Sequence, residues 1–184
     1  KQSMFEECSM MCNSIHDNTK ASKLLLHTEQ TQYPINFKYK LQDFKEHYYN
    51  VRGFADGVGV LNDKPFIFDL KTTNNIDQHF YTRQVIDMLY HLQASIYVRG
   101  YYAEHLKKPD FYHIVVENSA PYKVNVFKFN NDFIENGKQL FKKLVMYYDH
   151  CRVHDYWHKQ QDYKELNHWN KIEEINVPEW YQNI

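Results

Sequence analysis

The stretch FADGVGVLNDKPFIFDLKTT, residues 54–73, decides the fold of this chain. Two apolar runs flank a central Asn-Asp dipeptide, which favours a tight turn, so the stretch predicts a β-hairpin. Charged residues are poor strand formers, yet Asp56, Asp69 and Lys71 lie within these strands. They are therefore held there for a chemical purpose, or they lie on a hydrated face of the sheet.

Strand geometry suggests a metal site in this hairpin. Side chains alternate between the two faces of a strand, so Asp69 and Lys71 point to one side while Leu70 points into the core. Asp56, on the neighbouring strand, faces the same spot if the register allows it. Two carboxylates offer the hard oxygen ligands that Mg²⁺ takes, and a lysine beside them could position or deprotonate a water. The plainer alternative is an edge strand with a solvated lysine, since Asp-x-Lys triplets recur by chance.

The rest of the chain completes a mixed architecture. Helical spacing is predicted over residues 4–15, 20–27 and 76–104 and in a long helix that begins near Asn130 or Asn131; strands are predicted over residues 33–39, 47–61, 65–70, 111–117 and 122–129. This order predicts an α/β (α+β) fold, a central mixed β-sheet flanked by helices, in a single domain over residues 1–184. It does not alternate strand with helix and contains no glycine-rich phosphate loop, so we do not expect a doubly wound nucleotide-binding fold.

Composition limits the classes of protein. The 184 residues carry 22 basic and 23 acidic side chains, a net charge of −1 that neither indicates nor excludes a nucleic-acid partner. No apolar run approaches the roughly 20 residues that span a bilayer, so no membrane partner is expected. The three cysteines, an odd number, argue against a disulfide framework. We therefore expect a reduced, cytoplasmic protein.

Several motifs in order resemble one nuclease superfamily. FADGV and FDLKTT resemble the metal-binding strands of the PD-(D/E)XK nucleases; the later segments YHLQASIYVRGY, FYHIVVENSAPYKVNVFKF, FIENGKQLFKKLVMYYDHC and VPEW extend the likeness. The likeness is closest to the exonuclease VIII (RecE-like) branch of phages and prophages, and more distant to lambda-type exonucleases. It implies a restriction-endonuclease-like core and a Mg²⁺-dependent 5′-to-3′ exonuclease, with Mn²⁺ as a substitute, that acts on double-stranded DNA ends. It also implies a 3′ single strand left for a single-strand annealing protein, and a ring-shaped homo-oligomer.

The resemblance also implies roles for individual residues. Asp56 and Asp69 would ligate the metal, with the Leu70 backbone carbonyl as a further ligand. Lys71 would be the catalytic lysine, and Gln93 would lie beside it. These assignments come from the matching motifs and not from residue spacing.

Two further positions remain open. Tyr97 lies four residues after Gln93, so one helix face presents both, and it is a rim aromatic or a functional residue. Glu29 is similar to an upstream acid that reaches the metal in lambda-type enzymes, or it is an exposed glutamate. The exonuclease VIII branch carries an upstream Gly-x-x-x-His element for a second metal, and neither His16 nor His27 lies in such a motif. The chain is then a fragment, or its site uses Glu29.

Other constellations compete with this interpretation. A catalytically impaired DNA-binding domain that keeps the nuclease fold is the main alternative. His150, His154 and His158 recur at four-residue steps, which could suit zinc, although a solvated stripe is favoured because no further ligands are evident. Cys8 and Cys12 are expected to be buried on the apolar face of the first helix.

Overall fold

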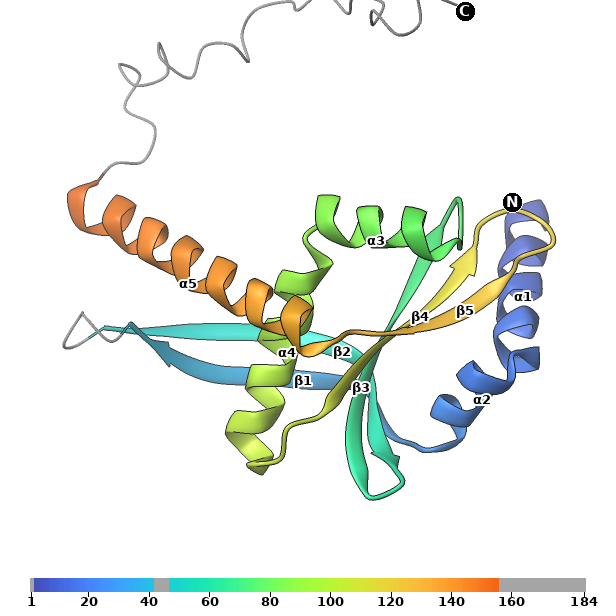
Figure 1. Ribbon diagram of the computed structural model, residues 1–184, viewed down its shortest axis with the longest axis horizontal. Coiled ribbons are helices and arrows are strands. Elements are labelled where there is room, and N and C mark those ends of the chain that lie inside the picture. The colour runs from blue at the N-terminus through green and yellow to red at the C-terminus, as the bar shows by residue number, and fades with distance from the viewer. Residues whose placement is uncertain (1, 42–46, 156–184) are drawn as a thin grey trace, which may run out of the picture. The chain divides into compact units, whose positions relative to one another are not determined.

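The computed structural model describes residues 2–41 and 47–155 of the chain. Its sheet has the order β1-β2-β3-β4-β5, and only the β3–β4 pair is parallel. The strands are β1 (Thr28–Lys40), β2 (Tyr48–Leu61), β3 (Lys64–Thr73), β4 (Asp110–Glu117) and β5 (Val124–Lys128). The helices are α1 (Gln2–Asp17), α2 (Thr19–Leu26), α3 (Gln78–Asp87), α4 (Tyr90–His105) and α5 (Asn131–His154). The predicted α+β fold with a mixed sheet is confirmed; α3 and α4 form the connection between the parallel strands (Figure 1).

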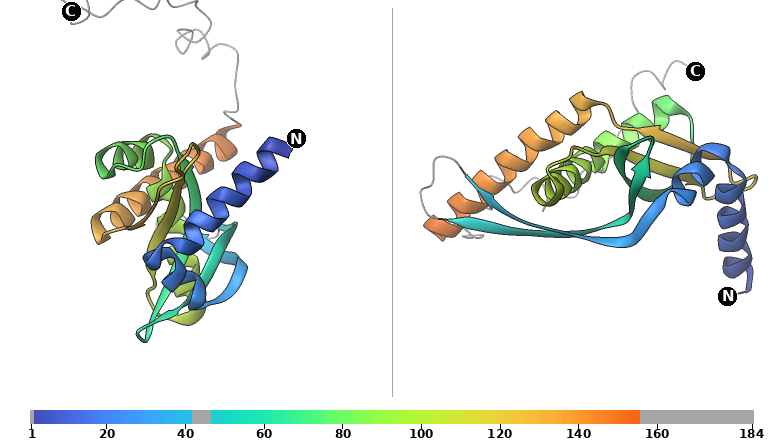
Figure 2. Two further views of the ribbon diagram at one scale, coloured as in Figure 1. Left: turned by 90° about the vertical axis from the view of Figure 1, so that its right-hand side faces the viewer. Right: turned by 90° about the horizontal axis from the view of Figure 1, so that it is seen from below.

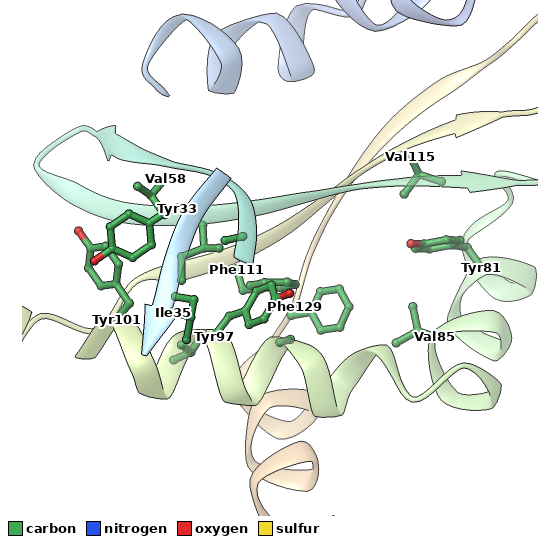
Figure 3. Packing of buried hydrophobic residues seen from close by; sticks show 14 residues of the cluster. Tyr33, Ile35, Val58, Tyr81, Val85, Tyr97, Tyr101, Phe111, Val115 and Phe129 are labelled. Atoms are coloured by element: carbon green, nitrogen blue, oxygen red, sulfur yellow. The ribbon is translucent and has the colours of Figure 1, made fainter. Parts of the chain in front are cut away.

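The two faces of the sheet pack against different helices. Ile67 of β3 and Phe111 of β4 join a core cluster with Tyr97 of α4 and Tyr81 of α3. Figure 3 shows the side chains of this cluster between the strands and these two helices. The alternate side chains, which include Phe68, pack against α2 in a second cluster. Alternation along β3 therefore assigns each of its residues to one helical layer or the other.

The hairpin predicted around the Asn-Asp dipeptide is present. Asn62 and Asp63 both adopt positive φ angles, 50° and 62°. Two consecutive positive φ angles match the twist of the flanking strands, and Asn and Asp tolerate this conformation better than most residues. The turn therefore follows from local chemistry.

Several local expectations were wrong. The single helix expected over residues 76–104 is two helices, separated at Met88 and Leu89, and Leu89 adopts a φ of 54°. Thr19 was expected to cap the second helix, but it is the first residue of α2; the cap is Asn18, whose side-chain oxygen accepts from the backbone N–H groups of Lys20 and Ala21. Cys8 and Cys12 are exposed, so they are not buried small hydrophobes.

The chain divides into two compact units, Lys1–Val145 and Met146–Ile184. The first holds the sheet, α1 to α4 and the first turns of α5. In the second, the rings of His150 and His154 lie 4.6 Å apart, while His158 lies outside the described residues. Among the helices described, none combines the length and apolarity needed to cross a bilayer.

Candidate functional site

The site begins where two antiparallel strands stop pairing. The β2–β3 ladder runs from Leu61↔Lys64 to Gly57↔Phe68, and Asp56 and Asp69 are the next residues on each strand. The Asp56 carboxylate accepts, through Oδ2, a hydrogen bond of 2.7 Å from the Leu70 backbone N–H. The Asp56 side chain thus accepts a hydrogen bond from a backbone N–H of β3 at the point where the β2–β3 ladder ends. This contact places Asp56 beside β3 at the level of Asp69.

Asp69 and Lys71 lie on one face of β3 and form an ion pair, as alternation predicted. Asp69 is only 4% exposed, and the side chain of Lys71 is 17% exposed. The Lys71 ammonium also lies 4.7 Å from the centre of the Tyr90 ring. Leu70 was expected in the core, and this was wrong, because it is 44% exposed. It points to the same face of the sheet as Phe68, and the helical layer on that face does not cover this end of β3.

Burial is the main influence on the Asp69 carboxyl group. It raises the pKa of Asp69, the hydrogen bond and charge of Lys71 lower it, and the charge of Asp56 raises it again, with a net increase. A buried carboxylate facing another carboxylate is short of compensating positive charge despite its lysine partner. The pair is therefore suited to a cation.

Helix α4 supplies a third polar group. Gln93 donates from Nε2 to Tyr97 Oη at 3.1 Å and to Asp69 Oδ1 at 3.4 Å. Its Oε1 is buried and has no hydrogen-bond partner within the described part of the chain. A buried amide oxygen without a donor costs free energy, and a water held at the site would satisfy it. Gln93 and Tyr97 therefore share one face of α4, as their four-residue spacing predicted, and this face is turned towards Asp69.

Two residues of the site were not expected from the sequence. The first is Gln32, which adopts a φ of 49° on β1 and whose Nε2 lies 3.4 Å from Asp56 Oδ1. A left-handed conformation within a strand is uncommon for a residue other than glycine, and nothing in the local sequence indicates it.

The second is His113, which lies on β4 beside Asp69, its partner in the β3–β4 register, and is fully buried. Burial and the positive charge of Lys71 lower its pKa from 6.5 to about 3, so the ring is neutral. Its Nδ1 lies 2.6 Å from the Tyr81 hydroxyl, and its Nε2 is buried without a partner among the described residues. The polar position in the apolar run FYHIVVE was the sequence signal for this residue.

Glu29 lies apart from the carboxylate pair. It is exposed at an irregularity of the β1–β2 register between Thr28 and Gln30, and its charge helps to raise the pKa of Tyr101. Among the described residues no group of three or more His, Cys, Asp or Glu side chains could hold a metal. Glu29 as a ligand stays a prediction.

The donor set fits Mg²⁺. Mg²⁺ is usually held by one or two carboxylates and keeps several waters or phosphate oxygens. Asp56 and Asp69 supply two carboxylates, and the unpartnered Gln93 Oε1 could accept from a metal-bound water. Zinc sites instead use Cys and His ligands, which the pair does not include.

Comparison with known proteins gives a family and a fold. Residues 45–165 match the family described as "PDDEXK-like domain of unknown function (DUF3799)". A crystal structure described as a "putative exonuclease" from Eubacterium rectale aligns with a TM-score of 0.62 at 10% sequence identity, over 95% of this chain and 63% of that one. This chain therefore spans less than two thirds of that protein, and the likeness concerns the fold alone.

A second solved structure, of the protein SSO0001, aligns with a TM-score of 0.39 at 11% identity, over 76% of this chain and 69% of that one. This likeness is too weak to bear on the fold. No curated protein matches the chain significantly.

Proposed function

The chain belongs to the PDDEXK-like family that matches residues 45–165, and on this basis we propose that it is a Mg²⁺-dependent deoxyribonuclease. The observation that carries the proposal is the meeting of three charged side chains at the end of the β2–β3 ladder. Asp56 is fixed there by the Leu70 N–H, and Asp69 is buried in an ion pair with Lys71. Such a cluster is suited to bind a cation and would leave a lysine beside it.

The residues divide the work of phosphodiester hydrolysis. Asp56, Asp69 and the Leu70 carbonyl would hold Mg²⁺, for which Mn²⁺ could substitute. Bound there, the ion would supply positive charge beside the phosphate and lower the pKa of a water at the site. The water oxygen bonds to phosphorus as the bond to the 3′ oxygen breaks; a proton passes to that oxygen, and the other product carries a 5′-phosphate.

Lys71 and Gln93 act on either side of Asp69. The Lys71 ammonium, held by Asp69 and lying near the Tyr90 ring, can position the attacking water and offset negative charge on the phosphate in the transition state. Gln93 fixes the other carboxylate oxygen of Asp69 through Nε2. This supporting contact sets the direction in which Asp69 presents its carboxylate.

The substrate proposed is the end of double-stranded DNA, degraded in the 5′-to-3′ direction to leave a 3′ single strand. The motifs that resemble the exonuclease VIII branch support this direction, and the structural likeness to the Eubacterium rectale protein, which is described as an exonuclease, supports exonuclease activity. The same resemblance supports a single-strand annealing partner, a ring-shaped homo-oligomer and a cytoplasmic location. None of these follows from the geometry of the site.

A second candidate is a DNA-binding domain that has kept the nuclease fold but not the activity. It is favoured by the position of Glu29, which leaves two carboxylates without a third among the described residues. It is opposed by Lys71, since a domain that only binds DNA has no need to bury a lysine against a carboxylate. Nucleotide release separates the two candidates.

The test is release of nucleotides from a linear duplex labelled at the 5′ or the 3′ end, with Mg²⁺ and beside a closed circle. We expect 5′-labelled nucleotides to appear first and the circle to persist. Lys71→Ala should abolish release, whereas Lys64→Ala, which removes an exposed lysine paired with Asp110, should not. DNA binding by the wild type without metal-dependent release would favour the second candidate.

A further inference from the structure

The β1–β2 hairpin extends alongside α4 and presents one face to solvent. On one side of the hairpin, Phe37, Tyr39 and Val51 pack towards the helices. On the other side every side chain is exposed. We name this side the outer face; its residues are Pro34, Asn36, Lys38, Lys40, Tyr48, Asn50, Arg52 and Phe54. In the right-hand view of Figure 2, α4 lies above the hairpin and no described element covers it from below.

The residues of the outer face form cross-strand pairs. The register places Pro34 opposite Phe54, Asn36 opposite Arg52, Lys38 opposite Asn50 and Lys40 opposite Tyr48. Directly opposite side chains in a sheet lie close enough to act together. The outer face is therefore a continuous two-residue-wide strip.

The chemistry of the strip is unusual for a solvated sheet face. It carries three cations, Lys38, Lys40 and Arg52, and no acidic residue. In the described part of the chain none of the three forms an ion pair, whereas Lys64 and Lys128 both pair with Asp110. A face kept only for solubility would mix both signs of charge. The strip is complementary to a polyanion.

Aromatic rings lie at both ends of this cationic strip. Phe54 is 61% exposed and Tyr48 is 52% exposed, one at each end of the strip. The Lys40 ammonium lies 5.5 Å from the centre of the Tyr48 ring. Between the ends lies an open groove of about 650 Å³, lined by Asn36, Lys38, Arg52 and neighbouring residues. Exposed rings spaced along a cationic groove suit unstacked bases joined by phosphates.

The strip ends at the candidate site. Phe54 lies two residues before Asp56 on β2, and Pro34 lies two residues after Gln32 on β1. From Tyr48 to Asp56 the strand covers about 26 Å, at roughly 3.3 Å per residue. The strip therefore leads along β2 towards Asp56, whereas Asp69 lies on the side of the sheet that faces α4.

We propose that the outer face of the β1–β2 hairpin binds single-stranded DNA and guides that strand towards Asp56, at the edge of the candidate site. A single strand is favoured over a duplex because the exposed rings need base faces, which a duplex keeps stacked inside. The guiding role rests on the proposed nuclease function, whereas the binding does not. The two can therefore fail separately.

The test measures binding without turnover. A fluorescent oligothymidylate of about 12 nucleotides and a duplex of equal length are titrated with wild-type protein in EDTA, which prevents metal-dependent cleavage. We expect the single strand to bind at least five-fold more tightly than the duplex. Phe54→Ala should weaken single-strand binding at least five-fold, because each stacked base contributes measurably. Arg52→Gln should weaken binding and make it less steeply dependent on salt.

Matched controls are available elsewhere on the surface. Tyr102→Ala removes an exposed ring from α4, and Lys143→Ala removes an exposed cation from α5. Both should bind like the wild type, and thermal melts should show every variant folded.

Three outcomes overturn the proposal. The variants Phe54→Ala and Arg52→Gln bind the single strand like the wild type, the duplex binds more tightly than the single strand, or heparin displaces the fluorescent oligothymidylate as well as the unlabelled oligothymidylate does. If the single strand binds as expected and no nucleotide is released with Mg²⁺, the nuclease function fails and this face still stands. If nucleotides are released with Mg²⁺ but Phe54→Ala binds the single strand as tightly as the wild type, the nuclease function stands and the proposed binding face fails.

Discussion

Asp56 on β2 accepts a 2.7 Å hydrogen bond from the backbone N–H of Leu70 on β3, between the two residues whose side chains form the ion pair of the site. One carboxylate thus fixes the strand that presents Asp69 and Lys71. The contact explains how a charged residue can lie at the end of a ladder: it satisfies a backbone donor where strand pairing stops. It also brings two carboxylates together, which costs free energy until a cation binds.

Removing the buried charge should separate catalysis from stability. Asp69→Asn should abolish Mg²⁺-dependent release, and in EDTA its midpoint of urea unfolding should equal or exceed that of the wild type, because the pKa of Asp69 is raised by burial. Mg²⁺ at about 100 times its Kd should stabilise the wild type by about 2.7 kcal/mol and leave the variant unchanged. A variant stabilised equally by Mg²⁺ would show that Asp69 is not a ligand.

Lys71→Ala should lower the rate of nucleotide release by a thousandfold or more, since loss of a transition-state charge partner costs several kcal/mol in the barrier. Affinity for DNA should change little, because phosphate contacts are spread over many groups. Single-turnover kinetics with saturating DNA measures this. A variant that loses affinity and keeps its rate would assign Lys71 to binding.

Gln93→Ala should slow release about 10- to 100-fold, the range expected when a group that orients a metal ligand is removed. Tyr97→Phe removes only the hydroxyl that accepts from Gln93 and should have a smaller effect. Raising the Mg²⁺ concentration should partly rescue Gln93→Ala, as measured by the rate at each concentration. If the two substitutions have equal effects, Gln93 acts through Tyr97 and not through Asp69.

His113 should make the fold sensitive to acid. Its pKa falls from 6.5 to about 3 in the folded protein, so between these values the unfolded chain binds more protons than the folded one. Stability is therefore complete above about pH 6.5 and is lost as the pH falls towards 3, by on the order of a few kcal/mol.

Comparison with His113→Gln isolates this contribution. The raised pKa of Asp69 acts with the opposite sign above its unfolded value, and it is present in both proteins. Urea unfolding at pH 7.5, 6, 5 and 4 in EDTA should give a flatter profile for the variant. Parallel profiles would show that His113 does not titrate as its burial requires.

Gly137→Ala should destabilise the protein although alanine is the better helix former. A Cβ at Gly137 would lie 2.0 Å from the backbone carbonyl oxygen of His91, so α5 could not approach α4 as closely. We expect a loss of about 1–3 kcal/mol, against a gain of about 1 kcal/mol from helix propensity alone. The exposed neighbour Asn136→Ala is the control and should be neutral or slightly stabilising. Unfolding that is no easier in Gly137→Ala than in this control would contradict the packing.

Much of the site was within reach of the sequence because it depends on local rules. The period of two along β3 places Asp69 and Lys71 on one face, and the spacing of four along α4 places Gln93 with Tyr97. The Asn62-Asp63 turn then sets the register that brings Asp56 opposite β3. Each of these steps involves residues close together in the chain.

The sequence did not predict three features: the exposure of Leu70, the left-handed backbone at Gln32 and the position of His113 beside Asp69. Leu70 is exposed because of where the opposite helical layer ends, Gln32 is constrained by a neighbouring strand, and His113 reaches Asp69 only through the parallel β3–β4 pairing. The sequence by itself determined which side chains share a face, since that depends on backbone geometry. Only the tertiary structure decided which face is buried and what lies against it, because burial depends on elements far away in the chain.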